Sequence, residues 1–195
     1  MSDEETLRVY AQKARDYEAL ARPDEYPTLT TFIAALPKGG DVLDLGCGPG
    51  LEAARMAQVG LRVEAMDASP EMVALAAARP GVAAQQGSFD DLCAERRYDG
   101  VWASFSLLHA PRAEMPRHLA AIARALRPDG VLSLTLKEGQ GEARDRLGRF
   151  YSYYTEPELR RLLADVGLRV DAVARGSGTG LDGTSSPWLS VLAHG

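Results

Sequence analysis

Short runs of apolar residues, each ending at small or polar turn residues, recur along this 195-residue chain. Several have the length of a buried strand, and segments with helix caps or helical periodicity follow most of them. The runs predicted as strands are residues 42–45, 61–67, 82–86, 98–104 and 131–136. Because strands that alternate with helices usually form parallel sheets, this pattern predicts an α/β fold.

The N-terminal region is predicted to be helical and to precede the sheet. Apolar positions recur at three- and four-residue spacing over residues 4–21, and a second helix is expected from Thr28 or Leu29 to Leu36. The apolar positions of the first helix are Leu7, Tyr10, Ala14 and Tyr17. We therefore expect a helical cap over residues 1–38.

The C-terminal region closes the predicted domain. Residues 112–126 form a clear amphipathic helix before the strand at 131–136. Residues 168–174 and 187–193 are predicted to pair as a hairpin across a loop rich in Gly, Ser and Thr. We expect residues 1–195 to form a single domain, with the core at 39–195.

A glycine loop follows the first predicted strand. Gly46, Gly48 and Gly50 are spaced G-x-G-x-G, and a helix is predicted directly after them. A dinucleotide fold requires G-x-G-x-x-G, and here Leu51 stands where the third glycine of that motif belongs. The G-K-[ST] ending of a phosphate loop is also missing. The loop therefore indicates a ligand held by backbone groups, but not a dinucleotide or a phosphate chain.

The second predicted strand ends in an acid. Asp67 lies 17 residues after Gly50, near the ~20-residue spacing at which an adjacent strand presents a carboxylate to a ribose. A carboxylate suits a diol because it accepts hydrogen bonds and donates none. Ser69 and Pro70 then begin a helix as its N-cap and first residue.

Val42-Leu43-Asp44-Leu45-Gly46-Cys47-Gly48-Pro49-Gly50, together with Asp67, resembles motif I and the following acid of class I S-adenosylmethionine-dependent methyltransferases. The resemblance implies a Rossmann-like, doubly wound, seven-stranded sheet of order 3-2-1-4-5-7-6, with strand 7 antiparallel. It also implies S-adenosylmethionine as cofactor and methyl transfer by in-line displacement. The cofactor-binding residues that it implies are Tyr17, Asp44, Gly46, Cys47, Gly48, Gly50, Asp67, Ala68, Ser88, Phe89, Asp90 and Ser104.

The adenine contact is left open between two residues. Relatives carry an acid directly after Gly87, whereas this chain has Ser88 there and acids at Asp90 and Asp91. Either Asp90 reaches the adenine amine, or Phe89 forms a wall beside the ring; Asp90 as an ordinary turn or cap residue is the third interpretation. After the fourth strand, Ser106-Leu107-Leu108-His109 resembles the small-molecule branch of the family.

Composition narrows the class of partner. A formal net charge of −5 argues against nucleic acid, since such affinity depends on neutralising phosphates. Apolar runs are too short for a membrane span, and the acidic start differs from a signal peptide. Cys47 and Cys93 lack metal-ligand spacing with the histidines, so no metal is expected. We expect a cytoplasmic monomer or weak homodimer.

Among the histidines, His109 is the candidate general base, because an unperturbed imidazole titrates near neutrality. The alternative is a hydrogen-bonded residue that anchors the loop after the strand. His118 is expected on the solvated side of its helix and His194 at the tail, both in structural roles.

The candidate substrate residues follow the fifth strand and the first helix. The cationic side chain of Lys or Arg can bind a carboxylate or phosphate, and tyrosines provide apolar ring faces with a polar hydroxyl. The predicted set is Tyr10, His109, Lys137, Arg149, Tyr151 and Tyr153. It indicates a small, polar, possibly anionic acceptor. The alternative is that the charged residues form surface ion pairs while the tyrosines pack under the last helix.

Other function classes stay open at this point. The same motifs suit a non-catalytic S-adenosylmethionine-binding sensor or partner protein. A nucleotide-dependent oxidoreductase is disfavoured by the glycine spacing.

Overall fold

The computed structural model describes residues 3–19 and 27–195. Its centre is a seven-stranded sheet of order β3-β2-β1-β4-β5-β9-β8. The strands are β1 (Asp41–Leu45), β2 (Arg62–Asp67), β3 (Val82–Gln86), β4 (Tyr98–Ser104), β5 (Leu126–Lys137), β8 (Arg169–Thr179) and β9 (Ser185–His194). Strands β1 to β5 pair in parallel, and β9 is antiparallel to both of its neighbours. The predicted order and the antiparallel last strand are confirmed.

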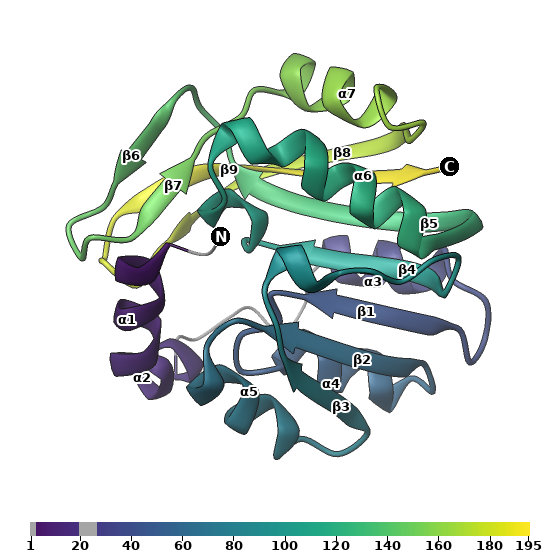
Figure 1. Cartoon of the computed structure of the whole chain (residues 1–195), viewed down its shortest axis with the longest axis horizontal. Helices are drawn as coiled ribbons and strands as arrows, with labels where there is room; N and C mark the ends of the chain where they lie inside the picture. The colour runs from purple at the N-terminus through teal and green to yellow at the C-terminus, as the bar shows by residue number, and fades with distance from the viewer. Residues whose placement is uncertain (1–2, 20–26) are drawn as a thin grey trace.

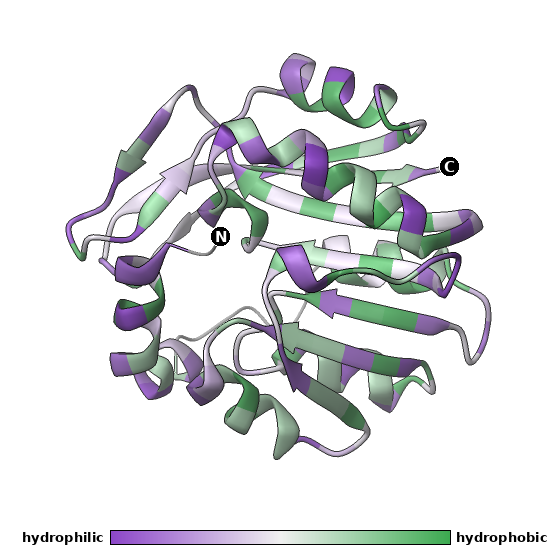
Figure 2. Ribbon diagram, in the orientation of Figure 1, coloured by the Kyte–Doolittle hydropathy of each residue, from purple (hydrophilic) through white to green (hydrophobic). Residues whose placement is uncertain are grey.

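Helices cover both faces of the sheet, so its central strands are buried on two sides (Figure 1). On one face α6 (Met115–Ala125) and α7 (Glu156–Ala164) bury Leu119 and Leu163. On the other, α3 (Pro27–Ala34) and α4 (Leu51–Gln58) pack around Trp102, and α5 (Pro70–Ala77) contributes Ala76. Figure 2 shows the hydrophobic residues concentrated in the central strands.

The N-terminal segment is divided differently from the prediction. The single helix expected over residues 4–21 is two helices, α1 (Glu4–Gln12) and α2 (Ala14–Glu18), which meet at Lys13. Residues 20 and 21 of that prediction lie outside the described residues. Helix α3 buries Phe32 beside Trp102, at 5.4 Å between ring centroids, so it belongs to a layer of the sheet. Of the described N-terminal helices, α1 and α2 are the ones that lie beside the carboxyl ends of the strands (Figure 1).

A small second sheet was not predicted. Strands β6 (Glu142–Arg144) and β7 (Phe150–Ser152) form a hairpin after β5 and lie next to α1 (Figure 1). Arg144 forms an ion pair with Asp3 at 2.7 Å, and the Phe150 amide donates to Thr6 Oγ1 at 2.8 Å. The hairpin therefore fixes the N-terminal end of α1. Within residues 3–19 and 27–195, none of the helices has the length and apolar character of a membrane span.

Candidate active site

A cavity opens at the carboxyl ends of β1, β2 and β4 and is covered by α1 and α2. Together with the part that is open to solvent, the space between its walls amounts to about 1000 Å³. The predicted cofactor residues that line it are Tyr17, Asp44, Gly46, Cys47, Gly48, Asp67, Ala68, Ser88, Phe89, Asp90 and Ser104. The fold thus brings nearly the whole predicted set to one place.

Gly50 is the member of that set that does not line the cavity. All three loop glycines have a left-handed backbone, with φ of +77° at Gly46, +51° at Gly48 and +72° at Gly50. A Cβ on Gly50 would lie 2.8 Å from the Ala76 Cβ, so this glycine allows α4 to pack against α5. A Cβ on Gly48 would have only Tyr17 nearby, at 3.5 Å. Gly48 is therefore the position where the backbone is open to a ligand.

Asp67 stands at the end of β2 and organises this loop. Its Oδ2 accepts from the Gly48 amide at 2.8 Å, and its Oδ1 accepts from the Ser69 amide at 2.9 Å. Burial raises the pKa of Asp67, and these two backbone donors partly offset the effect. Because a carboxylate offers about four lone-pair sites, acceptor capacity is left for the hydroxyls of a ribose.

The turn after β3 forms the next part of the wall. The Ser88 hydroxyl caps a 3-10 turn, and the Asp91 carboxylate accepts a hydrogen bond from the Ser88 amide. Ser88 and Asp91 are therefore the residues that cap this turn. Asp90 pairs with Arg117 at 2.5 Å. Phe89 and Asp90 both line the cavity. The adenine contact therefore stays a proposal between these two residues.

His118 corrects a prediction. It is buried, with 3% of its surface exposed, and lines the cavity, whereas the sequence analysis placed it on the solvated side of α6. Its ring lies 5.5 Å from the Phe89 ring, and its Nε2 lies 3.5 Å from Glu114 Oε2. Burial lowers the pKa of His118. His118 lies on the buried face of α6 with Met115, Leu119 and Ile122, at the three- and four-residue spacing of a helix, so the periodicity itself contained the signal.

The exit of β4 supplies residues that sequence reasoning missed. Phe105 lines the cavity with φ of +52°, a backbone conformation that is rare for a bulky residue and that clusters at functional sites. Ser106 also lines the cavity, and its buried Oγ has no hydrogen-bond partner among the described residues. Other lining residues that were not predicted include Trp102, Glu52 and Thr6. A ligand with polar groups would satisfy the Ser106 hydroxyl.

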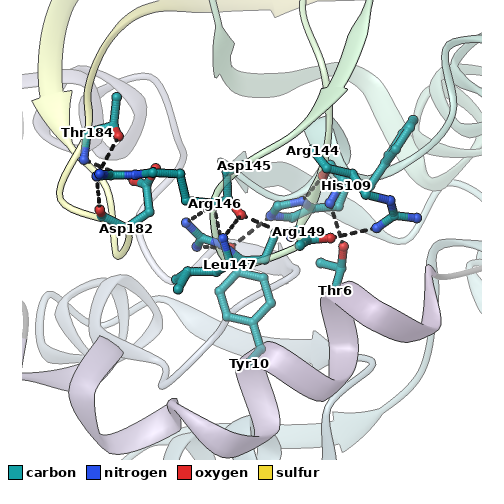
Figure 3. A network of polar contacts seen from close by, with 12 residues as sticks. Thr6, Tyr10, His109, Arg144, Asp145, Arg146, Leu147, Arg149, Asp182 and Thr184 are labelled. Carbon is teal, nitrogen blue, oxygen red and sulfur yellow. Dashed lines mark hydrogen bonds and ion pairs between the residues drawn. The ribbon is translucent and has the colours of Figure 1, made fainter.

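His109 lines the cavity beside Tyr10 of α1, and it belongs to a network of hydrogen bonds (Figure 3). Its Nδ1 lies 2.6 Å from the Phe150 carbonyl oxygen, which can only accept, so Nδ1 carries the proton. Its Nε2 therefore accepts from the Tyr10 hydroxyl at 2.8 Å. Burial lowers the pKa of His109 to about 4, and the positive charges of Arg149 and Lys137 add to the shift. The imidazole is neutral near pH 7 and presents its lone pair toward α1.

Four of the predicted substrate residues lie behind this network. Lys137, Arg149, Tyr151 and Tyr153 do not line the cavity, whereas Tyr10 and His109 do. Arg149 donates to Asp145 Oδ2 at 2.6 Å and to Tyr10 Oη at 3.1 Å. Lys137 Nζ lies 3.9 Å from the centre of the Tyr151 ring, and that ring lies 4.7 Å from His109. These residues support the wall of the cavity from outside.

The neutral state of His109 predicts a pH effect on stability. The folded-state pKa of about 4 lies below the ordinary value of 6.5, so the unfolded chain binds this proton first as pH falls. The stability due to His109 is therefore present above about pH 6.5 and is lost toward pH 4. We expect the destabilisation caused by His109→Gln to be larger at pH 7.5 than at pH 4.5, measured by thermal unfolding. An equal loss at both pH values would contradict the assignment.

A glycine loop after a central parallel strand, an acid at the end of the neighbouring strand and a cavity at their carboxyl ends define the site of an S-adenosylmethionine-dependent methyltransferase. The residues fit that cofactor. Asp67 can accept from its ribose hydroxyls, Gly48 allows close backbone approach, and the cavity is lined by several carboxylates, which suits a ligand with sulfonium and ammonium charges.

Comparisons with known proteins agree. A family model described as "methyltransferase domain" matches residues 42–130. The structure of Burkholderia thailandensis 1,6-didemethyltoxoflavin-N1-methyltransferase, with its substrate and S-adenosylhomocysteine bound, is similar at a TM-score of 0.80 and 26% identity, over 97% of this chain and 87% of that one. An uncharacterised methyltransferase of Staphylococcus carnosus is 25% identical over 195 residues, covering 88% of this chain and 94% of that protein.

A third relative matches over a shorter region. The ubiquinone biosynthesis O-methyltransferase of Xanthomonas axonopodis pv. citri is 37% identical over 118 residues. The match covers 56% of this chain and 48% of that enzyme, so the chain spans about half the length of this relative. Together these similarities support a class I S-adenosylmethionine-dependent methyltransferase with S-adenosylmethionine as its cofactor.

Proposed function

We propose that this methyltransferase acts on a small polar molecule held between α1 and the exit of β4. The observation that carries the proposal is that one cavity runs from the cofactor loop at Gly48 to Tyr10 and His109. An acceptor at the Tyr10 end would lie in the same enclosed space as the cofactor. The similar Burkholderia thailandensis enzyme takes a small molecule, 1,6-didemethyltoxoflavin, which supports this size class.

The cation-based part of the predicted substrate site receives less support. Lys137 and Arg149 suggested an anionic acceptor from the sequence, yet Arg149 pairs with Asp145 and neither cation lines the cavity. Tyr151 and Tyr153 lie in the same outer layer. We therefore propose Tyr10 and His109 as the residues that contact the acceptor, with the other four as their support.

When bound, S-adenosylmethionine supplies an electrophilic methyl group on sulfur. The protein's task is to align the acceptor atom with that methyl group and to exclude water. Helices α1 and α2 cover the cavity and serve the second purpose. His109 and Tyr10 form a hydrogen-bonded pair that fixes this wall of the cavity. Because the pKa of His109 is lowered to about 4, the pair serves to position the acceptor rather than to take up its proton.

The test is turnover. Purified protein is incubated with S-adenosylmethionine and a library of small polar metabolites, and S-adenosylhomocysteine release is measured by mass spectrometry. We expect release above the acceptor-free rate with a subset of compounds, and a reduced rate in Tyr10→Phe. If the protein binds S-adenosylmethionine and no class of compound raises the release, the non-catalytic binding protein becomes the better description.

A further inference from the structure

The turn after β3 forms the part of the cavity wall that lies beyond Asp67 as seen from the glycine loop. The loop follows β1, Asp67 ends β2, and β3 is the neighbour of β2 on the side away from β1. In S-adenosylmethionine the ribose joins the methionine part to the adenine. With the methionine part at the glycine loop and the ribose at Asp67, the adenine comes to the side of β3, where Phe89 and Asp90 line the cavity.

Ser88 stands where relatives carry an acid, and its hydroxyl is used inside the turn. Ser88 Oγ donates to Asp91 Oδ2 at 2.8 Å and accepts from the Asp90 amide at 3.3 Å. Asp91 also accepts from the Ser88 amide, at 2.7 Å, and it does not line the cavity. Neither residue therefore takes the place of that acid, and an acceptor for the adenine amine has to come from another part of the wall.

His118 of α6 brings two ring nitrogens to this part of the wall. The side chain lines the cavity although only 3% of its surface is exposed. Among the described residues, Nε2 has no hydrogen-bond partner. It lies 3.5 Å from Glu114 Oε2, and Nδ1 lies 3.9 Å from Asp90 Oδ1, both too far for a good hydrogen bond. Because buried polar groups are nearly always hydrogen-bonded, this ring is suited to a ligand in the cavity.

The surroundings of the ring decide which nitrogen can accept. Burial lowers the pKa of His118, so the ring is neutral near pH 7 and carries one proton. We assign the proton to Nε2, the nitrogen nearer to a carboxylate, since a carboxylate only accepts. Nδ1 then holds a lone pair and lies on the side of Asp90. His118 Nδ1 and the Asp90 carboxylate are thus neighbouring acceptors that come from different elements.

A flat ligand with an amine fits these surroundings. The exocyclic amine of adenine has two N–H groups, so it can donate to an acceptor on each side. The Phe89 ring lies 5.5 Å from the His118 ring, between centroids, and also lines the cavity. Aromatic side chains of this kind pack against a planar base in offset or edge-on arrangements.

We propose that His118 recognises the adenine of the cofactor, with Nδ1 accepting a hydrogen bond from the exocyclic amine beside Asp90 and Phe89. The sequence analysis gave His118 a structural role and left the adenine contact to Asp90 or Phe89. The proposal adds a residue from α6, a distant element. It rests on the proposed function only for the identity of the cofactor, and it requires no particular methyl acceptor.

The experiment compares two ligands that differ at the amine. S-adenosylhomocysteine carries it, whereas S-inosylhomocysteine has a carbonyl oxygen in its place. Binding of each ligand to the full chain is measured by isothermal titration calorimetry at pH 7.5. We expect the native protein to bind S-adenosylhomocysteine at least about tenfold tighter, because a carbonyl oxygen cannot donate to the lone pair of His118.

His118→Leu removes that lone pair and keeps an apolar side chain. The preference should fall by at least about fivefold, mainly through weaker binding of S-adenosylhomocysteine. A purely structural role of His118 would weaken both ligands equally and leave the preference unchanged. His194→Leu is the matched control, since His194 also faces a carboxylate, that of Asp171, but does not line the cavity. It should keep the native preference.

Nitrogen NMR of the native protein with isotope-labelled histidine gives an answer even if His118→Leu does not fold. The Nδ1 signal of His118 should shift when S-adenosylhomocysteine is added, because its lone pair then accepts a hydrogen bond. An Nδ1 signal that stays in place, an unchanged preference in folded His118→Leu, or equal native affinity for the two ligands would overturn this inference and leave the proposed function standing. A native protein that binds neither ligand would overturn the proposed function itself.

Discussion

Replacing Asp67 by alanine is expected to weaken S-adenosylhomocysteine binding by about 1–3 kcal/mol, or roughly 5- to 150-fold. The carboxylate is the group at the end of β2 that can accept from ribose hydroxyls, and it also holds the Gly48 and Ser69 amides. Its loss leaves both the ligand and the loop without an acceptor. Isothermal titration calorimetry of the purified variant measures the change.

Asp165→Ala is the matched control for this variant. Asp165 is an exposed acid at the end of α7 whose side chain lies 3.4 Å from Arg161, so its removal should leave binding unchanged. Unaltered affinity in Asp67→Ala, with a native circular dichroism spectrum, would remove Asp67 from the ribose site.

Gly46→Ala is expected to destabilise the fold by about 2–5 kcal/mol. The left-handed backbone costs an L-residue roughly 1–2 kcal/mol, and overpacking adds about 1–3 kcal/mol. The φ of Gly46 is +77°, and its new Cβ would lie 2.2 Å from the Ser106 Cβ. Urea unfolding monitored by fluorescence gives the free energy of unfolding.

Gly48→Ala separates the two causes, because Gly48 has a left-handed backbone as well, but its new Cβ would make only an ordinary contact with Tyr17 at 3.5 Å. It should lose only the conformational part. Ser106→Gly in the Gly46→Ala background should recover part of the loss by removing the colliding Cβ. If Gly46→Ala and Gly48→Ala were equally destabilised, the contact with Ser106 would not be the reason for a glycine at position 46.

The sequence predicted the sheet well, and it named candidate cofactor residues that the fold brings to one cavity, for a physical reason. Strands buried on both faces need continuous apolar runs, and residues 42–45 and 98–104 show them directly. The spacing of the glycines predicts the tight turn of the loop. The position of Asp67 is predicted because it is the last residue of the second strand. Each of these signals is local in the chain.

The acceptor half depends on partners distant in sequence. Tyr10 and His109 meet across 99 positions, and no periodicity encodes that contact. Strands of three residues, such as β6, are too short to show alternation. Arg149 looked like a substrate-binding cation because its charge is visible in the sequence while its burial beside Asp145 is not. Asp145, four positions before Arg149, was the feature of the sequence that could have indicated this ion pair.

The hairpin β6–β7 and helix α1 hold one another through Arg144, Asp3 and Thr6, while the cofactor loop is built by other parts of the chain. If Tyr10 contacts the acceptor as proposed, acceptor choice and cofactor binding depend on different segments of the polypeptide. We expect that exchanging residues 3–12 and 142–152 together between homologues would change the acceptor while the glycine loop and Asp67 stay in place. Exchanging either piece alone would break the contacts that hold the pair, so new specificities in this scaffold should arise by coordinated change in both.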